Sequence, residues 1–332
     1  MQKLRIGLFG VGHLGRIHLK CILLSDQYEL VGVFDPDNEA ITKAQEQNDF
    51  QRYTNADELI KEVDVVDIVV PTIYHFEIAK KALSEGKHVF IEKPVTKTSK
   101  EAKELKELAE SKSLKIQVGH VERFNPAFLA LRDLEFSPAF IEGHRLAHFN
   151  PRGTDVSVVY DLMIHDLDIV LSLISSDVDQ VQANGVSIVS EQADICNARI
   201  QFKNGAVANL TASRISLKNM RKLRLFQRNA YISMDFLKKS SEIIQLKESD
   251  ELNAAEKDKY MKLELPDKDK YISVQMPEIQ PVNAILMELE SLAEAIHQNT
   301  DPLVNIEDGL KALELAEKIS ESLESSQVFE VS

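Results

Sequence analysis

Apolar residues in the first 120 positions follow a repeated strand–helix pattern. Short runs rich in β-branched side chains occupy residues 4–10, 28–35, 64–72, 87–94 and 114–120. They lack regular polar alternation, which is typical of strands buried on both faces. Segments with helical periodicity lie between them, at residues 15–25, 37–48, 74–86 and 99–113. This alternation predicts an α/β domain with a doubly wound parallel sheet over residues 1–122.

The pattern changes after that point. Residues 125–134 and 158–174 have helical character, and β-like segments follow at 139–149, 181–189, 196–202, 206–216, 222–227 and 230–236. Lys203-Asn204-Gly205 is a hairpin turn signal between two of them. Residues 237–270 are charged and predict hairpins and a long loop, and two helices close the chain at 284–298 and 306–324. We therefore expect an α+β domain with a largely antiparallel, open-faced sheet over residues 123–332.

Net charge, apolar run lengths and cysteine usage exclude several classes of function. The net charge of −14 disfavours a duplex nucleic acid as a partner. One local group of basic residues is either a solvated strand face or a contact for substrate phosphates: Arg214, Lys218, Arg221, Lys222, Arg224 and Arg228. No signal-peptide pattern or membrane-length apolar run is apparent, and Cys21 and Cys196 suit a reducing compartment. We expect a cytoplasmic protein.

The first strand leads into a glycine motif, Gly10-Val11-Gly12-His13-Leu14-Gly15, which opens a helix. In a strand–helix–strand unit, such glycines allow a tight turn and close approach of a pyrophosphate to the helix N-terminus, as in the Rossmann fold. The second strand ends at Asp35, where an acid would bind the adenosine ribose hydroxyls and repel a 2′-phosphate. The motif predicts NAD binding, with NADP less favoured. The alternative is a glycine-rich turn that binds nothing.

A second group of polar residues lies on the helix predicted at 158–174. Asp161, His165 and Asp168 are spaced to fall on nearly one face, while Asp166 points elsewhere. This is either a satisfied buried contact, a catalytic pair or, least favoured because no further ligand motif accompanies it, part of a metal site. We expect no metal.

A third feature is the strand end His88-Val89-Phe90-Ile91-Glu92-Lys93-Pro94. Proline alone would only end strand pairing. Together with the glycine motif and the Asp161–His165–Asp168 spacing, it makes the chain resemble the glucose–fructose oxidoreductase / inositol dehydrogenase / MocA family of nicotinamide-dependent oxidoreductases, nearly end to end.

The resemblance implies a role for each matching residue. It places Lys93 beside the nicotinamide and the substrate hydroxyl, with Glu92 before it and Pro94 shaping the turn. It assigns the family's acid, histidine and last acid to Asp161, His165 and Asp168, although the family's glycine is Met163 here, which puts backbone approach at that point in doubt. Three residues match positions near the nicotinamide half of the cofactor: Pro71, Thr72 and His75.

The resemblance also suggests a substrate. Residues 118–128 look like members that act on nucleotide sugars, particularly UDP-N-acetylglucosamine 3-dehydrogenases, whose keto product a partner aminotransferase converts. There Arg123 would contact cofactor or substrate, and Asn125 with Pro126 would begin a helix. In the implied mechanism His165 is the general base, because imidazole ordinarily titrates near neutral pH. Asp161 orients it or binds a neighbouring hydroxyl, and Lys93 stabilises the developing charge.

Two rival readings remain open from the sequence. A free sugar, polyol or cyclitol would use the same residues in the same roles. A cofactor-binding regulator without catalysis is disfavoured because Lys93, Asp161 and His165 are all present. The resemblance further implies a homodimer or homotetramer.

Overall fold

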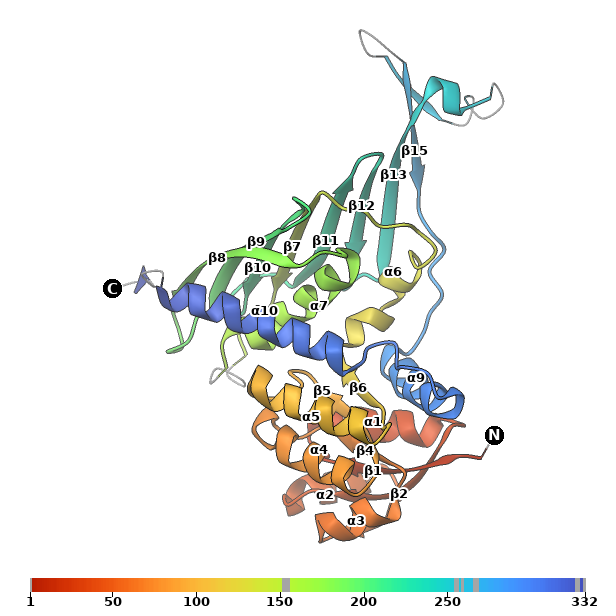
Figure 1. Ribbon diagram of the computed structural model, residues 1–332, viewed down its shortest axis with the longest axis vertical. Coiled ribbons are helices and arrows are strands. Elements are labelled where there is room, and N and C mark those ends of the chain that lie inside the picture. Colours follow the sequence, from red (N-terminus) through yellow and green to blue (C-terminus); the bar gives the residue numbers. More distant parts are fainter. Residues whose placement is uncertain are drawn as a thin grey trace. The chain divides into compact units, whose positions relative to one another are not determined.

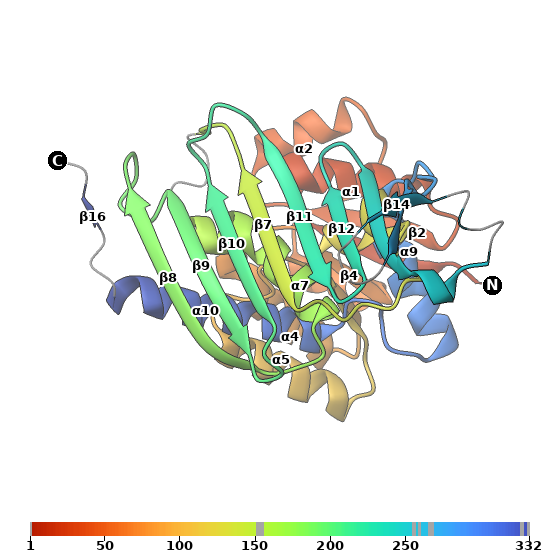
Figure 2. The same cartoon turned by 90° about the horizontal axis from the view of Figure 1, so that it is seen from above.

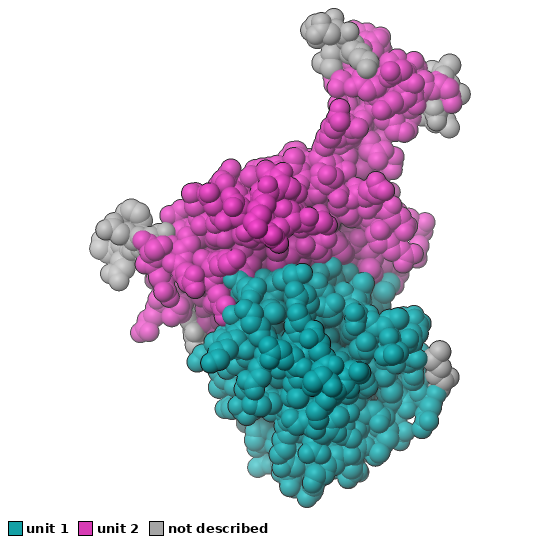
Figure 3. Space-filling view, viewed as in Figure 1, with its two compact units in different colours: residues 1–124, 282–314 teal, residues 125–281, 315–332 magenta. Residues whose placement is uncertain are grey.

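The computed structural model describes residues 2–150, 156–253, 257, 260–264, 269–325 and 329–330. The chain divides into two compact units, coloured separately in Figure 3. Unit 1 is Met1–Phe124 with Val282–Glu314, and unit 2 is Asn125–Pro281 with Leu315–Ser332. The first break falls close to the boundary predicted at 122. The return of residues 282–314 to unit 1 was not predicted, because helical periodicity does not reveal which sheet a helix packs against.

Unit 1 contains a six-stranded parallel sheet in the order β3-β2-β1-β4-β5-β6. Its strands are β1 (Leu4–Phe9), β2 (Tyr28–Phe34), β3 (Arg52–Tyr53), β4 (Val65–Ile68), β5 (His88–Glu92) and β6 (Ile116–Gly119). Its helices are α1 (His13–Leu24), α2 (Asn38–Gln45), α3 (Ala56–Glu62), α4 (His75–Ser84), α5 (Ser99–Ser111) and α9 (Ala284–Gln298). The predicted doubly wound parallel sheet is confirmed (Figure 1).

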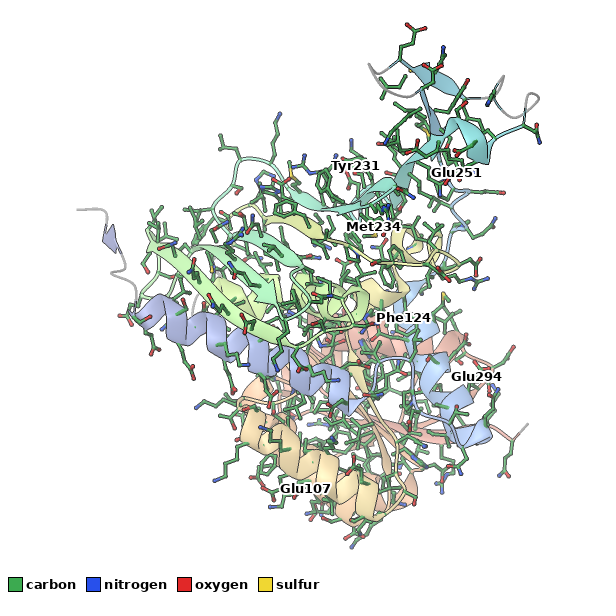
Figure 4. The ribbon with its side chains drawn as sticks, turned by 45° about the horizontal axis from the view of Figure 1, so that its top comes forward. Glu107, Phe124, Tyr231, Met234, Glu251 and Glu294 are labelled. Atoms are coloured by element: carbon green, nitrogen blue, oxygen red, sulfur yellow. The ribbon has the colours of Figure 1, made fainter. Side chains whose placement is uncertain are left out.

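Alternation along β1 sends side chains to both faces of this sheet. Ile6 and Leu8 share a buried core with α1, α2 and α9, to which α9 contributes Leu289 and Leu292. Position 7 faces the opposite side of the sheet, where a Cβ added to Gly7 would lie 2.9 Å from the Leu59 side chain of α3. Outward-facing positions on the helices are charged, as at the exposed Glu107 of α5 and Glu294 of α9 (Figure 4).

Unit 2 contains a ten-stranded sheet in the order β14-β15-β13-β12-β11-β7-β10-β9-β8-β16. Its strands are β7 (Phe140–Leu146), β8 (Val178–Ser187), β9 (Ile195–Phe202), β10 (Val207–Ser213), β11 (Met220–Gln227), β12 (Ala230–Asp235), β13 (Ser240–Glu248), β14 (Met261–Leu263), β15 (Lys270–Gln275) and β16 (Phe329–Glu330). Among these pairings, β7–β10 and β8–β16 are parallel and the others antiparallel, as the sequence predicts for the most part.

One face of this sheet is covered by helices and the other is open. Helix α7 (Ile164–Leu173) and the second part of α10 (Ile306–Ser325) lie behind the strands in Figure 2. The core between these layers includes Ile141, Leu167 and Ile319. The open face has a row of touching aromatic rings, with centroids 5.8 Å apart from Phe140 to Phe226 and 5.1 Å from Phe226 to Tyr231. The predicted open-faced sheet is confirmed.

The hairpin predicted at residues 203–205 joins β9 to β10. Gly205 has φ +88°, a conformation that glycine adopts without strain. The Phe202 N–H donates to the Ala206 carbonyl across the turn. Farther along, β13 and β15 extend beyond the other strands into an arm that also includes β14 (Figure 1).

Candidate active site

The glycine loop between β1 and α1 has the geometry of an anion cradle. Gly10 has φ +91°, and an added Cβ there would lie 2.6 Å from the Val69 carbonyl oxygen. A Cβ on Gly15 would lie 2.1 Å from the Gly10 carbonyl oxygen, so both glycines are required by close packing. A Cβ on Gly12 would meet nothing within 4 Å, which leaves room beside the backbone. Gly12 is the N-cap of α1 and has no side chain to cap it, so the helix N-terminus fits a pyrophosphate.

Asp35 follows β2, and its carboxylate binds the backbone of the glycine loop. Its Oδ2 accepts a hydrogen bond of 2.8 Å from the Val11 N–H, and its Oδ1 accepts one of 2.8 Å from the Asp37 N–H. Each carboxylate oxygen has a second lone pair for a further donor. The acid therefore lies at the glycine loop, where the sequence places it, and ribose hydroxyls suit its remaining acceptor positions. His13 and Leu14 are exposed on the first turn of α1.

Lys93 lies directly after β5, at the carboxyl edge of the unit 1 sheet. Its side chain is half-buried, and its backbone N–H donates to Glu92 Oε2 at 3.1 Å. The Lys93–Pro94 peptide bond is cis. Glu92 is 8% exposed and points back under the sheet edge toward α1.

Under this edge Glu92 contacts His18, a residue for which the sequence predicts no role. His18 Nε2 lies 3.2 Å from Glu92 Oε1, and His18 Nδ1 lies 3.0 Å from Asp67 Oδ2. Burial alone would lower the pKa of His18, but the charges and hydrogen bonds of the two carboxylates raise it well above its ordinary value. Burial alone would raise the pKa of Glu92, yet His18 and, to a smaller extent, Lys93 bring it below its ordinary value. One sequence signal was present: a histidine on the sheet-facing side of an apolar helix.

Pro71, Thr72 and His75 follow the next carboxyl edge, after β4. Pro71 is exposed and Thr72 half-buried, whereas His75 is buried. Its Nδ1 lies 3.0 Å from the Pro94 carbonyl oxygen and its Nε2 lies 2.9 Å from the Val70 carbonyl oxygen. Burial lowers the pKa of His75 in spite of these two carbonyls. The ring therefore joins the loop after β4 to the turn that contains Lys93.

The segment predicted to begin a helix does so. Asn125 accepts from the Ala127 N–H at 3.0 Å as the N-cap of α6 (Pro126–Leu129), with Pro126 in the first turn. Just before it, Arg123 belongs to the 3-10 helix η2 (Val121–Phe124) of unit 1. Arg123 Nη2 lies 3.7 Å from Asp308 Oδ1.

Asp161, His165 and Asp168 belong to unit 2, where the predicted helix is not regular throughout. It begins as a π-helical turn, η3 (Val159–Met163), in which the Ile164 N–H bonds to the Val159 carbonyl five residues earlier. The wider turn changes the angular spacing assumed for a plain α-helix. Asp161 and His165 are partly exposed, whereas Asp168 is 1% exposed, so the three do not present one common accessible face.

Two residues close to His165 in the sequence, Met163 and Asp166, anchor this helical segment in unit 2. Met163, which replaces the family's glycine, is fully buried in the unit 2 core. Asp166 accepts from Arg145 of β7 in a bidentate pair, with Nε at 3.0 Å and Nη2 at 2.8 Å. Both side chains are buried, so the pair ties α7 to the sheet directly beside His165.

The basic residues noted in the sequence do not form one groove. Arg214 is 4% exposed and its guanidinium donates to the Val156 carbonyl. Lys222 and Arg224 pair with Asp235 and Glu142 on neighbouring strands, at 3.5 and 3.1 Å. These contacts favour the reading of a strand face with salt bridges.

Within the described part of the chain, no group of three or more histidine, cysteine or acidic side chains is arranged to hold a metal ion. In the same residues, none of the helices combines the length and apolar character of a membrane span.

Comparison with known proteins identifies both halves of the chain. Residues 4–120 match the model of an oxidoreductase family with an NAD-binding Rossmann fold, and residues 150–331 match the α/β C-terminal domain of the same family. A UDP-N-acetylglucosamine 3-dehydrogenase from Acidithiobacillus ferrooxidans is 40% identical over 238 residues, which cover 71% of this chain and 75% of that protein. A myo-inositol 2-dehydrogenase from Thermotoga maritima is 23% identical over 98% of this chain and 97% of its own.

Solved structures agree with this assignment. A structure of the Acidithiobacillus ferrooxidans UDP-N-acetylglucosamine 3-dehydrogenase has a TM-score of 0.86 and 32% identity, covering 98% of this chain and 99% of its own. A scyllo-inositol dehydrogenase from Lactobacillus casei, with bound NAD(H) and scyllo-inositol, shares the fold with a TM-score of 0.77 at 20% identity, over 98% of both chains. With its glycine cradle, its acid after β2 and its two matched domains, this chain belongs to the glucose–fructose oxidoreductase / inositol dehydrogenase / MocA family of NAD-binding oxidoreductases.

Proposed function

We propose that this protein oxidises the C3 hydroxyl of UDP-N-acetylglucosamine, with NAD as the hydride acceptor. The observation that carries the proposal is the 40% identity to a UDP-N-acetylglucosamine 3-dehydrogenase over 71% of the chain. The TM-score of 0.86 to a structure of that enzyme supports it over nearly the whole length.

Unit 1 supplies the cofactor site in this proposal. The Gly10–Gly15 loop and the uncapped N-terminus of α1 hold the pyrophosphate. Asp35 binds the adenosine ribose, and its charge disfavours the 2′-phosphate of NADP. Pro71, Thr72 and the Glu92–Lys93 turn contribute to the nicotinamide half, and His75 supports them from below through its two carbonyl contacts. The cofactor supplies a carbon that accepts a hydride.

The proton of the sugar hydroxyl is removed by residues of this chain. His165 accepts it as the general base, and Asp161 orients the imidazole or binds a neighbouring hydroxyl. As the O–H bond breaks and the C3 hydrogen leaves with its electron pair, the oxygen forms the carbonyl of a 3-keto sugar. Lys93 donates a hydrogen bond to that oxygen while negative charge develops. The resemblance assigns Arg123 and Asp168 to the substrate. Arg123 is kept as a contact in this proposal, whereas Asp168 is 1% exposed, which leaves almost no surface for one.

The test is the absorbance of reduced nicotinamide with purified protein, NAD and separate UDP-sugars, free sugars and cyclitols. Reduction specific to UDP-N-acetylglucosamine is expected. An aminotransferase with its amino donor, added in parallel, should increase the yield by consuming the keto product, as a pathway partner would. Reduction with free inositol or glucose alone would overturn the substrate, and NAD binding without reduction of any of them would overturn the enzymatic role.

The proposal includes a homodimer or homotetramer in the cytoplasm. The partly exposed aromatic row at Phe140, Phe226 and Tyr231, of which Phe226 is 39% exposed, supports self-association through the open sheet face. Light scattering on the wild type and on a Phe226→Glu variant is the measurement: the variant should dissociate, and an unchanged mass would contradict this interface.

A further inference from the structure

Three buried side chains form a continuous bridge under the strand ends of unit 1. His18 of α1 is 0% exposed, Asp67 of β4 is 0% exposed and Glu92 of β5 is 8% exposed. The imidazole lies between the two carboxylates at 3.0 and 3.2 Å and meets the Phe90 ring edge-on at 5.4 Å. The bridge thus joins the helix that begins at the glycine loop to the ends of two neighbouring strands.

The chemistry of the partners defines the charge of the ring. Burial raises the pKa of Asp67, although the charge and hydrogen bond of His18 oppose this effect. While both partners are ionised, each accepts hydrogen bonds and donates none, so an imidazole held between them satisfies both only when both of its nitrogens carry protons. Such a buried cation between buried anions is held in place by charge as well as by hydrogen bonding, because the low local dielectric strengthens both.

The second oxygen of Glu92 extends the bridge to the turn. Glu92 Oε2 accepts from the Lys93 N–H at 3.1 Å, so one carboxylate contacts both His18 and the backbone of Lys93. Space for this carboxylate comes from β6, where a Cβ on Gly119 would lie 2.8 Å from Glu92 Cδ and Oε1. The Glu92 side chain is therefore confined by His18 on one side and by a residue that must lack a side chain on the other.

We propose that His18 is a positioning residue for catalysis: from the helix that begins at the glycine loop, it fixes through Glu92 the backbone turn that presents Lys93. The inference rests on the proposed catalytic role of Lys93. His18 itself is buried and acts only through Glu92.

The experiment is a double-mutant cycle between His18→Gln and Lys93→Ala, run on whichever substrate the wild type oxidises. His18→Gln should lower kcat by up to about 100-fold, the cost of misplacing a reacting group by an ångström. It should leave the dissociation constant of NADH, followed by nicotinamide fluorescence, within about twofold of the wild type. In the Lys93→Ala background it should lower kcat by no more than about twofold, since no lysine then remains to be positioned. If His18→Gln lowered kcat by the same factor with Lys93 present and in the Lys93→Ala variant, the proposal would be overturned.

A matched control and a second variant keep the test decisive. His88→Gln replaces a partly buried histidine at the start of β5, one that accepts from the Lys115 N–H, and should not change kcat. If His18→Gln fails to fold, Gly119→Ala tests the same link, because its methyl group displaces the Glu92 carboxylate with His18 in place. Gly119→Ala should lower kcat when Lys93 is present and leave it unchanged in the Lys93→Ala variant. Normal turnover by Gly119→Ala with Lys93 present would refute the proposed role of Glu92 in positioning Lys93. A wild type inactive on UDP-N-acetylglucosamine but active on another sugar refutes only the proposed substrate.

Discussion

The buried pair of Arg145 and Asp166 offers a sharp test of how α7 is held beside His165. Its side chains are 3% and 5% exposed, and two hydrogen bonds of 3.0 and 2.8 Å join them. Removing one partner leaves the other charge buried, which costs about 3–5 kcal/mol. Arg145→Met and Asp166→Asn should therefore each lower the free energy of unfolding of unit 2 by about 3–5 kcal/mol.

Two comparisons separate this mechanism from a general loss of contacts. The double variant Arg145→Met with Asp166→Leu leaves no unpaired charge, so it should be more stable than either single variant. The exposed pair of Lys203 and Asp177 has a similar separation, 3.0 Å, but side chains 62% and 78% exposed. Lys203→Met should cost only about 0.2–1 kcal/mol, because water screens the pair.

The assay is urea unfolding followed by circular dichroism and tyrosine fluorescence, since the chain has no tryptophan. Because two units can unfold in separate steps, hydrogen exchange on β7 peptides is needed to assign the transition to unit 2. Losses below about 1 kcal/mol for both single variants, or a double variant less stable than either, would refute the reasoning.

Three further predictions follow from the site. Lys93→Ala and His165→Ala should each lower kcat by about 10²- to 10⁴-fold with little change in NADH binding, and near-normal turnover by either variant would exclude its role. Asp35→Ser should shift the ratio of kcat/KM values toward NADP, because it removes a charge that repels the 2′-phosphate; an unchanged ratio would remove Asp35 from the ribose site. The His18 pKa is raised by folding, so its stabilisation is complete below about pH 6.5 and is lost as pH rises through the raised value. The difference in unfolding free energy between wild type and His18→Gln should therefore shrink at alkaline pH, and a growing difference would contradict this sign.

Much of unit 1 was predictable because its signals are local. The apolar runs, the glycine loop and the acid after β2 each lie within a few residues of the element they specify. The same holds at the start of unit 2, where Asn125 caps a helix that starts at the next residue. The antiparallel character of unit 2 was predictable for the same reason, since a turn such as Lys203–Gly205 specifies its own pairing.

The rest depends on contacts between distant segments. His18 meets Asp67 and Glu92 across 49 and 74 residues, and no spacing rule relates them. The π-helical turn before His165 was also not predicted, because apolar periodicity does not distinguish it from an α-helix. Asp168 has the predicted spacing from His165, yet it is only 1% exposed, and a sequence period does not report burial.

The return of α9 to unit 1 has a consequence for how the chain is made. The Tyr28 hydroxyl donates to the Leu289 carbonyl at 2.6 Å across 261 residues, and Leu289, Leu292 and Ala293 belong to the same core as β1 and α1. At about 5–20 residues per second, a ribosome needs roughly 13–50 s to add this intervening length. During that time the first strands are already outside the ribosome, but α9, which packs against the apolar surface of α1, has not yet been synthesised. The nascent chain is thus a natural client for chaperones that bind exposed apolar segments, and a chain cut off after residue 281 cannot complete its first core.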